Sequence, residues 1–201
     1  KHIKIFKLIL QISYEIDRAY LQMIAINQNK INSGAYNSPE VSINSNLRRW
    51  FKRNIGLWKS ERIYFFQDKN RNYNICMNLK IECLQNKKPW ESHYKFTWYP
   101  SEKYSFFDDN PEFKERGEMK AFIQGHQLIR ENFYLSEKKG ISSIRQVDEH
   151  EMIFESTYDD WYILEHTRLV DMDRLRYRVI YSWHRNNLKI VENHHESRVF
   201  S

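Results

Sequence analysis

The sequence has 201 residues, enough for one domain with a sizeable core, and a formal charge of +6. A positive charge suits an acidic partner such as nucleic acid, an anionic membrane or a carboxylate ligand. Both signs of charge are interspersed along the chain, whereas a nucleic-acid-binding protein is expected to carry a basic stripe, so we expect no nucleic-acid partner. No apolar run reaches roughly 18 residues, so no membrane-spanning helix is expected.

The composition argues against disorder and against most enzyme classes. Glycine (5) and proline (4) are scarce and aromatic residues make up 15% of the chain, which favours a sheet-rich fold. Cys76 and Cys83 are expected to be ordinary buried thiols, with neither a disulfide framework nor a metal signature. The sequence contains no Gly-rich phosphate loop and no serine nucleophile elbow, and we expect no metal site and no prosthetic group.

The first 28 residues have apolar side chains every three to four positions, which predicts an amphipathic helix. A basic start followed by apolar residues is also typical of a targeting segment, but Glu15 and Asp17 interrupt it and no small-residue cleavage pattern follows. We therefore expect an accessory helix. Residues 29–44 are rich in Asn, Ser, Gly and Pro, which predicts a linker, so 1–45 form an extension ahead of the main domain, 46–201.

A short helix is predicted over 45–54, and from Leu57 onward short aromatic runs alternate with polar turns, as is typical of an antiparallel sheet or barrel. The runs are numerous enough to close a barrel, with room for a small ligand in its lumen or at its mouth. The predicted strands lie near 57–67, 73–84, 92–99, 102–107, 117–123, 126–134, 141–147, 151–158, 162–170, 174–183 and 188–199.

Charged residues inside the last predicted strands need an explanation. Side chains alternate across a strand, so Arg174, Arg176 and Arg178 share one face, while Leu175 and Tyr177 share the other. The arginines either face water or line a pocket for an anion. For an arbitrary β-protein the outward orientation is expected, since unpaired buried charge is costly.

The final strand shows the same alternation, with Glu192, His194, Glu196 and Arg198 on one face. In a pocket, arginine would take carboxylates in bidentate fashion and glutamate would accept N–H groups. His194 and its neighbour His195 point to opposite faces, so they are not expected to grip one metal ion.

Short motifs occur in a fixed order over residues 46 to 200, and in this order they resemble the motifs of the S-type phycobiliprotein lyases. That family's pattern begins Gly-x-Trp-x-Ser-x-Arg, contains Leu-Arg-Leu-Arg and closes with Glu-x-Arg. The matching segments are Gly56-Leu57-Trp58-Lys59-Ser60-Glu61-Arg62, Phe96-Thr97-Trp98, Leu128-Ile129-Arg130 with Tyr134, Ser156-Thr157-Tyr158, Glu165, Leu175-Arg176-Tyr177-Arg178 and Glu196-Ser197-Arg198.

The resemblance implies a mainly β fold, a lipocalin-like antiparallel β-barrel of about ten strands with an N-terminal and a short accessory helix. It implies a phycobiliprotein lyase that binds a phycobilin, such as phycoerythrobilin or phycocyanobilin, as its substrate. The lyase delivers the bilin for thioether attachment to a cysteine of a phycobiliprotein subunit such as phycoerythrin. It would act by positioning, without a nucleophile of its own. The alternative is a non-catalytic lipocalin-like carrier of a bilin, haem or fatty acid.

The resemblance also implies roles for particular residues. Glu165 and Glu196 would be catalytic, contacting the pyrrole nitrogens and keeping the chromophore protonated. The gap between Glu165 and the arginines is one residue longer than in the family, so the propionates would pair with either Arg176 and Arg178 or Arg174 and Arg176. Ile180 replaces a serine that is common in the family. The implied ligand-binding residues are Trp98, Arg130, Arg174, Arg176, Arg178 and Arg198.

The resemblance implies partners and a compartment as well. The bilin would be transferred to an apo-phycobiliprotein subunit, with a bilin reductase as a donor and a homodimer as an expected assembly. Phycobiliproteins are assembled in an algal plastid or in the cyanobacterial cytoplasm, so one of these two compartments is expected.

Overall fold

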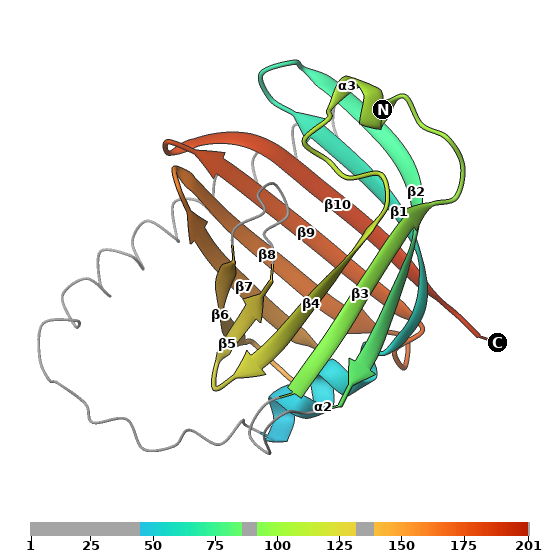
Figure 1. The fold of residues 1–201 in the computed structure, drawn as a ribbon, viewed down its shortest axis with the longest axis vertical. Helices are drawn as coiled ribbons and strands as arrows, with labels where there is room; N and C mark the ends of the chain where they lie inside the picture. The colour runs from blue at the N-terminus through green and yellow to red at the C-terminus, as the bar shows by residue number, and fades with distance from the viewer. Residues whose placement is uncertain (1–44, 86–91, 132–138, 201) are drawn as a thin grey trace, which may run out of the picture. The chain divides into compact units, whose positions relative to one another are not determined.

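The computed structural model of the protein describes residues 45–85, 92–131 and 139–200. The helix predicted over 1–28, the linker at 29–44 and Tyr134 lie outside these residues. The described residues form two helices and ten strands (Figure 1): α2 (Ser45–Arg53), β1 (Gly56–Phe66), β2 (Arg71–Leu84), β3 (Ser92–Pro100), α3 (Phe106–Asp109), β4 (Gly117–Gln124), β5 (Gln127–Arg130), β6 (Gly140–Gln146), β7 (Glu151–Tyr158), β8 (Trp161–Val170), β9 (Leu175–His184) and β10 (Asn187–Val199).

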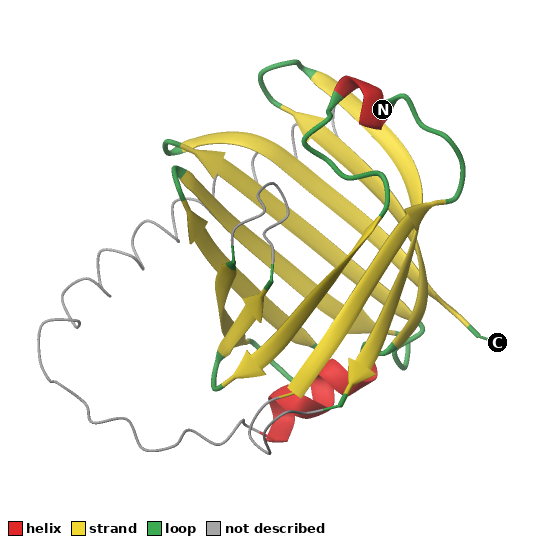
Figure 2. Cartoon of the chain, in the orientation of Figure 1, coloured by secondary structure: helices red, strands yellow, loops and turns green. Residues whose placement is uncertain are grey.

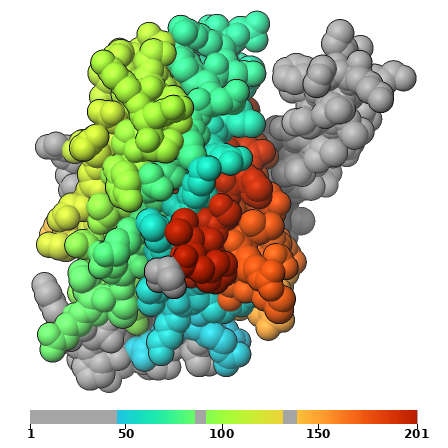
Figure 3. Space-filling model, turned by 90° about the vertical axis from the view of Figure 1, so that its right-hand side faces the viewer, coloured from blue at the N-terminus to red at the C-terminus, as the bar shows by residue number. Residues whose placement is uncertain are grey.

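The strands form a closed antiparallel barrel, which confirms the predicted fold class. Each strand pairs with its neighbours in the chain, and β1 pairs with β10 from Leu57 opposite Val199 to Phe66 opposite Ile190. In Figure 3 the red end of β10 lies beside the cyan residues that begin the described chain. Closure leaves no unpaired sheet edge between β1 and β10. Because side chains alternate along a strand, every second side chain points into the interior of the barrel.

The two helices lie at opposite ends of the barrel (Figures 1 and 2). Helix α2 buries Leu47, Trp50 and Phe51, which the helical period places on one side, against inward residues of the barrel. The Trp50 indole N–H donates to the His150 carbonyl at 2.8 Å, which ties α2 to the β6–β7 connection. At the other end Phe106 of α3 packs on Tyr64, with ring centroids 4.5 Å apart.

The predicted strand at 102–107 is wrong, because this segment contains a turn and helix α3. Its aromatic run favours a strand, but Phe106 is buried only when the chain turns there, and the Asn110 backbone N–H then bonds to the Phe106 carbonyl at 3.0 Å. The strand predicted over 126–134 ends at Arg130 within the described residues. The last two strands are joined by Arg185 and Asn186, both at positive φ, as a two-residue hairpin requires.

The outer surface of the barrel carries features that the sequence did not predict correctly. Cys76 is half-buried and Cys83 is exposed, so the expectation of two buried thiols is wrong.

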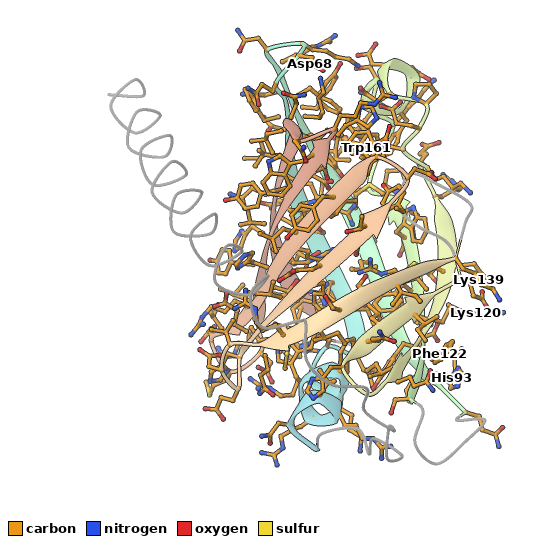
Figure 4. The ribbon with its side chains drawn as sticks, turned by 90° about the vertical axis from the view of Figure 1, so that its left-hand side faces the viewer. Asp68, His93, Lys120, Phe122, Lys139 and Trp161 are labelled. Carbon is orange, nitrogen blue, oxygen red and sulfur yellow. The ribbon has the colours of Figure 1, made fainter. Side chains whose placement is uncertain are left out.

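On the outside of β3 and β4, His93 stacks on Phe122 with ring centroids 5.2 Å apart (Figure 4). None of the helices in the described residues is long and apolar enough to cross a membrane.

Candidate functional site

One wall of the barrel interior is polar and comes from β1, β10, β9 and β8. The registers set Ser60 beside Glu196 and Glu196 beside Arg176, all facing inward. In the next inward row, His194 lies between Arg62 and Arg178. These six side chains are buried or nearly so, since even the Arg178 side chain is only 12% exposed. The charged side chains that alternate along these strands therefore point into the barrel. This corrects the outward orientation expected for an arbitrary β-protein.

Glu196 and Arg176 form a fully buried ion pair at the base of this wall. Arg176 Nε donates to Glu196 Oε2, Ser60 donates to Glu196 Oε1 at 3.0 Å, and Arg178 Nη1 lies 3.6 Å from the same oxygen. Burial opposes ionisation of Glu196, but the Arg176 and Arg178 charges outweigh it and lower its pKa to about 2. Glu196 is therefore ionised at neutral pH. The Arg176 guanidinium lies over the Trp58 ring, 4.5 Å from its centroid, and its Nη1 donates to Asn54 at 2.8 Å.

Arg176 retains one donor that the described residues do not satisfy. Its Nη2 is buried and has no hydrogen-bond partner among them. The Arg176 side chain lines the cavity and is only 4% exposed. Burying a charged donor without an acceptor costs about 1 to 3 kcal/mol or more. A carboxylate oxygen of a ligand is the partner that this geometry suits best.

Glu165 holds a second pair of arginines. Its Oε1 accepts from Thr167 and from Arg178 Nε, each at 3.0 Å, and its Oε2 lies 3.7 Å from Arg130 Nη2, beyond hydrogen-bond distance. Burial raises the pKa of Glu165, but the charges of Arg178 and Arg130 and the two hydrogen bonds outweigh it and lower the pKa overall. Glu165 is thus an ionised carboxylate whose Oε2 retains acceptor capacity toward the cavity.

A third buried carboxyl, Glu192, lies next to His194. Its Oε2 is 3.1 Å from His194 Nε2, and both residues are almost completely buried. Burial raises the pKa of Glu192 to about 7, with Arg62 and Arg178 offsetting part of the effect. Burial and the charges of Arg62, Arg178 and Arg176 hold the pKa of His194 well below its usual range, so the imidazole is neutral. His194 Nδ1 has no partner among the described residues.

The opposite wall is apolar and comes from β2, β3 and β4. Its centre is Trp98, which packs against the core clusters of both ends of the barrel. Its indole N–H donates to the Lys114 carbonyl at 3.0 Å, and its ring lies over Gly117, where an added Cβ would be 2.7 Å from Trp98 Cζ2. The remaining apolar residues that line this wall of the cavity are Ile75, Met77, Leu79, Ile81, Phe96 and Met119.

The two walls enclose a cavity of about 150 Å³. Phe51 and Phe154 close it toward α2, and Phe107 and Phe113 line it toward α3. Among the described residues, the charged side chains that line it are four arginines (Arg62, Arg130, Arg176 and Arg178), Lys114, Glu118 and Glu165. Behind this lining lie Glu196, whose pKa is about 2, and Glu192, whose pKa is about 7. The cavity therefore combines aromatic surfaces with excess positive charge, a combination that suits an apolar ligand bearing carboxylates.

The structure brings most of the predicted site residues together. Trp98, Arg130, Glu165, Arg176 and Arg178 all line the cavity. Glu196 does not reach it and instead lies behind Arg176, with no exposed surface, so its observed contact is with the arginine that faces the cavity.

Arg174 and Arg198 lie apart from the cavity. Arg174 belongs to the β8–β9 turn, whose residues Asp171 to Asp173 have positive φ, and its half-exposed side chain lies 4.0 Å from Asp171. The expected pair of Arg174 and Arg176 does not share the cavity, because β9 begins at Leu175 and, of the three arginines, only Arg176 and Arg178 line it. Arg198 donates to the carbonyls of Asp173, Ile55 and Arg53 and so fastens the end of α2.

The polar lining residues that sequence reasoning missed include Arg62, Asn54 and Thr167. For Arg62 the signal was present, because Trp58, Ser60, Arg62 and Tyr64 alternate along β1 in the same way as the arginines of β9. Thr167 follows Glu165 at a spacing of two on β8, which gives it the same orientation. Within the described ranges, no group of three His, Cys, Asp or Glu side chains is arranged to hold a metal ion.

These features define a lipocalin-like β-barrel with a charged internal pocket. No protein-family model and no curated protein matches the sequence. Among solved structures, the S-type phycobiliprotein lyase CPES from Guillardia theta is similar, with a TM-score of 0.59 and 16% identity over 77% of this chain and 93% of that chain. A protein of unknown function from the DUF3598 family of Nostoc punctiforme is also similar, with a TM-score of 0.52 and 16% identity over 81% of this chain and 53% of that chain. At these identities the similarity shows the fold.

Proposed function

We propose that the protein is a bilin lyase, which binds a phycobilin in the barrel and delivers it to a cysteine of a phycobiliprotein subunit. The observation that carries the proposal is the unpaired, buried Nη2 of Arg176, whose side chain lines a cavity with an apolar opposite wall around Trp98. The similar fold of a phycobiliprotein lyase and the order of the sequence motifs support it.

The chemistry of an open-chain tetrapyrrole matches both walls. Its conjugated body would lie against Trp98 and the apolar side chains of β2 and β3, and its two propionates would pair with the guanidinium groups of Arg176 and Arg178. Arg178 is already bonded to Glu165 and Arg176 to Glu196, so both forks are held in place before the ligand arrives. Preorganised donors lose little conformational entropy on binding.

Glu165 would act on the chromophore. With Oε1 engaged by Thr167 and Arg178, its Oε2 would accept a pyrrole N–H, and the negative charge would keep the ring nitrogens protonated. A protonated chromophore draws electrons from its exocyclic ethylidene carbon. The acceptor thiolate would then add to that carbon with formation of the C–S bond, and the displaced electron pair would be taken up by the protonated conjugated system. Positioning, and not a protein nucleophile, would be the source of catalysis.

The lyase proposal is tested with an apo-phycobiliprotein subunit. Bilin-loaded protein should give a coloured adduct that survives denaturation, whereas Glu165→Gln should retain bilin and transfer it more slowly. Arg176→Ala and Arg178→Ala should weaken bilin binding. Unchanged transfer in all three variants would remove these assignments.

A non-catalytic carrier of a bilin, haem or fatty acid is the second candidate, because it would share the pocket but not the acceptor. A chain that binds bilin tightly and never yields a covalent adduct with any subunit would be such a carrier. Preferential binding of a fatty acid, which has one carboxylate, would contradict the pairing of two propionates with two arginines.

A further inference from the structure

We propose that Glu192 takes up a proton when a ligand with two carboxylates binds in the cavity, and that this residue thereby adjusts the interior charge to a dicarboxylate. The inference rests on the proposed function, since it concerns the same pocket. Glu192 has no role in the positioning of the ligand described above, and it is only 4% exposed.

The groups that face Glu192 come from five strands. His194 of β10 lies 3.1 Å away, and Tyr64 of β1 hydrogen-bonds to the carboxyl. Arg62 of β1 and Arg178 of β9 attract its negative charge, whereas Glu165 of β8 repels it. Tyr158 of β7 is also affected: burial raises the pKa of its phenol to about 12, and the charge of Glu192 adds to this effect.

The two nearby arginines form hydrogen bonds with residues other than Glu192. Arg178 is bonded to Glu165 and lies 3.6 Å from Glu196, while Arg62 donates to the Ser60 hydroxyl at 3.0 Å. The cross-strand neighbour of Glu192 on β9 is Ile180, which is buried and offers no hydrogen bond. Ile180 also lies between Glu192 and Glu165 in the register. The carboxyl is therefore withdrawn from water without a strong cationic partner, a setting in which the neutral form is stable.

The interior charge depends on this one proton. With Glu192 protonated, the four cavity arginines exceed the ionised Glu165 and Glu196 by two charges, which equals the charge of two propionates. Lys114 and Glu118 also line the cavity, and their opposite formal charges leave this difference unchanged. With Glu192 ionised the excess is one charge. Since burial holds the pKa of Glu192 at about 7, both forms are populated before the ligand binds. Negative charge placed beside Arg178 then favours the protonated form.

Binding and protonation are consequently linked. If the dicarboxylate binds the protonated form, its apparent affinity is scaled by the fraction of that form, which falls from about nine tenths at pH 6 to about one tenth at pH 8 for a group with a pKa of about 7. The affinity should then weaken by about tenfold over this range. At pH 8 the Glu192 carboxyl should take up more than about half a proton for each ligand bound.

The test uses biliverdin, an open-chain tetrapyrrole with two propionates, and isothermal titration calorimetry at pH 6, 7 and 8. Each titration is repeated in two buffers with different ionisation enthalpies, which gives the number of protons taken up. The variants are Glu192→Gln, an isostere of the neutral acid, and Glu61→Gln as a matched control, whose side chain is 66% exposed on the outside of β1. Biliverdin dimethyl ester serves as a ligand without carboxylates.

We expect Glu192→Gln to lose the roughly tenfold weakening of biliverdin affinity that Glu192 causes between pH 6 and pH 8, and Glu61→Gln to behave like the parent chain. Protonation of the chromophore itself contributes equally to the parent and to Glu192→Gln, so the difference between them isolates Glu192. Ile180→Ser, which offers a hydroxyl to the charged form, should weaken binding at pH 7. With the dimethyl ester, the difference between the two chains should vanish.

Equal proton uptake in the parent and Glu192→Gln, or an equal pH dependence of affinity in the two chains, would overturn the inference and leave the lyase proposal intact. Failure of biliverdin to bind at any pH would overturn both. Bilin binding with the expected proton uptake, but no transfer to a subunit, would refute only the lyase.

Discussion

Replacing Glu196 by Gln should destabilise the protein strongly, because this carboxylate is ionised in a fully buried position. Its pKa is about 2 in the folded chain and about 4.5 when unfolded, and that difference is worth about 3 kcal/mol at pH 7. Gln keeps the shape and still accepts from Ser60 and Arg176, so the loss isolates the negative charge.

The effect should depend on pH with a defined sign. A folded-state pKa below the unfolded value means that the contribution is complete above pH 4.5 and is lost as the pH falls toward 2. The gap between the parent chain and Glu196→Gln should therefore shrink from about 3 kcal/mol at pH 7 to about 1.5 kcal/mol at pH 3.

Urea denaturation followed by tryptophan fluorescence measures both values, with Glu61→Gln as the exposed control. A loss below about 1 kcal/mol at pH 7 would show that Arg176 does not need the charge of Glu196. A gap of the same size at pH 3 and pH 7 would show that packing, and not ionisation, accounts for the loss.

Three further outcomes are expected. Arg176→Lys keeps the charge but loses the planar guanidinium fork, so biliverdin should bind about tenfold more weakly. The control Arg174→Lys, in the β8–β9 turn, should leave the Kd of biliverdin unchanged. Equal effects of the two substitutions would contradict the assignment of Arg176 as the inward arginine. Gly117→Ala places a methyl group against Trp98 and should lower the free energy of unfolding by about 1 to 3 kcal/mol in urea denaturation, with a shifted tryptophan emission. An unchanged unfolding transition would mean that the Trp98 ring moves aside without cost. Serine in place of both cysteines should leave the yield of coloured adduct unchanged, and its loss would point to a thiol of this chain in the transfer.

Alternation along the strands was sufficient to predict an antiparallel sheet or barrel and to group its charged residues, and the family resemblance specified the barrel. The pattern at Arg176 and Arg178 fixed their common face, but not its direction, because an outward arginine and an inward, paired arginine leave the same two-residue period. The direction depends on Glu196 and Glu165, which reach the arginines only when β10 and β8 flank β9. That neighbourhood is a property of the closed sheet, and the family resemblance was the sole indication of it in the sequence.

The errors arose where tertiary contacts or turn geometry overrode local preference. Phe106 belongs to an aromatic run that favours a strand, yet its ring is buried against Tyr64 and Tyr73 through a helical turn. Arg174 continues the alternation of β9, but the four-residue turn that precedes Leu175 takes it out of the sheet. A period of two carries no information about where a strand begins.

The division of the interior into a charged wall and an apolar wall also divides the chain. The ion pairs that the fold needs are carried by β1 and by the consecutive hairpins β8 to β10, whereas the surfaces that would contact a flat ligand are carried by β2 to β4. Substitutions such as a larger side chain at Met119 or Phe96 would reshape the lumen without disturbing Glu196 or Glu165. Ligand preference can therefore diverge in one stretch of sequence while the electrostatic framework is inherited unchanged in another.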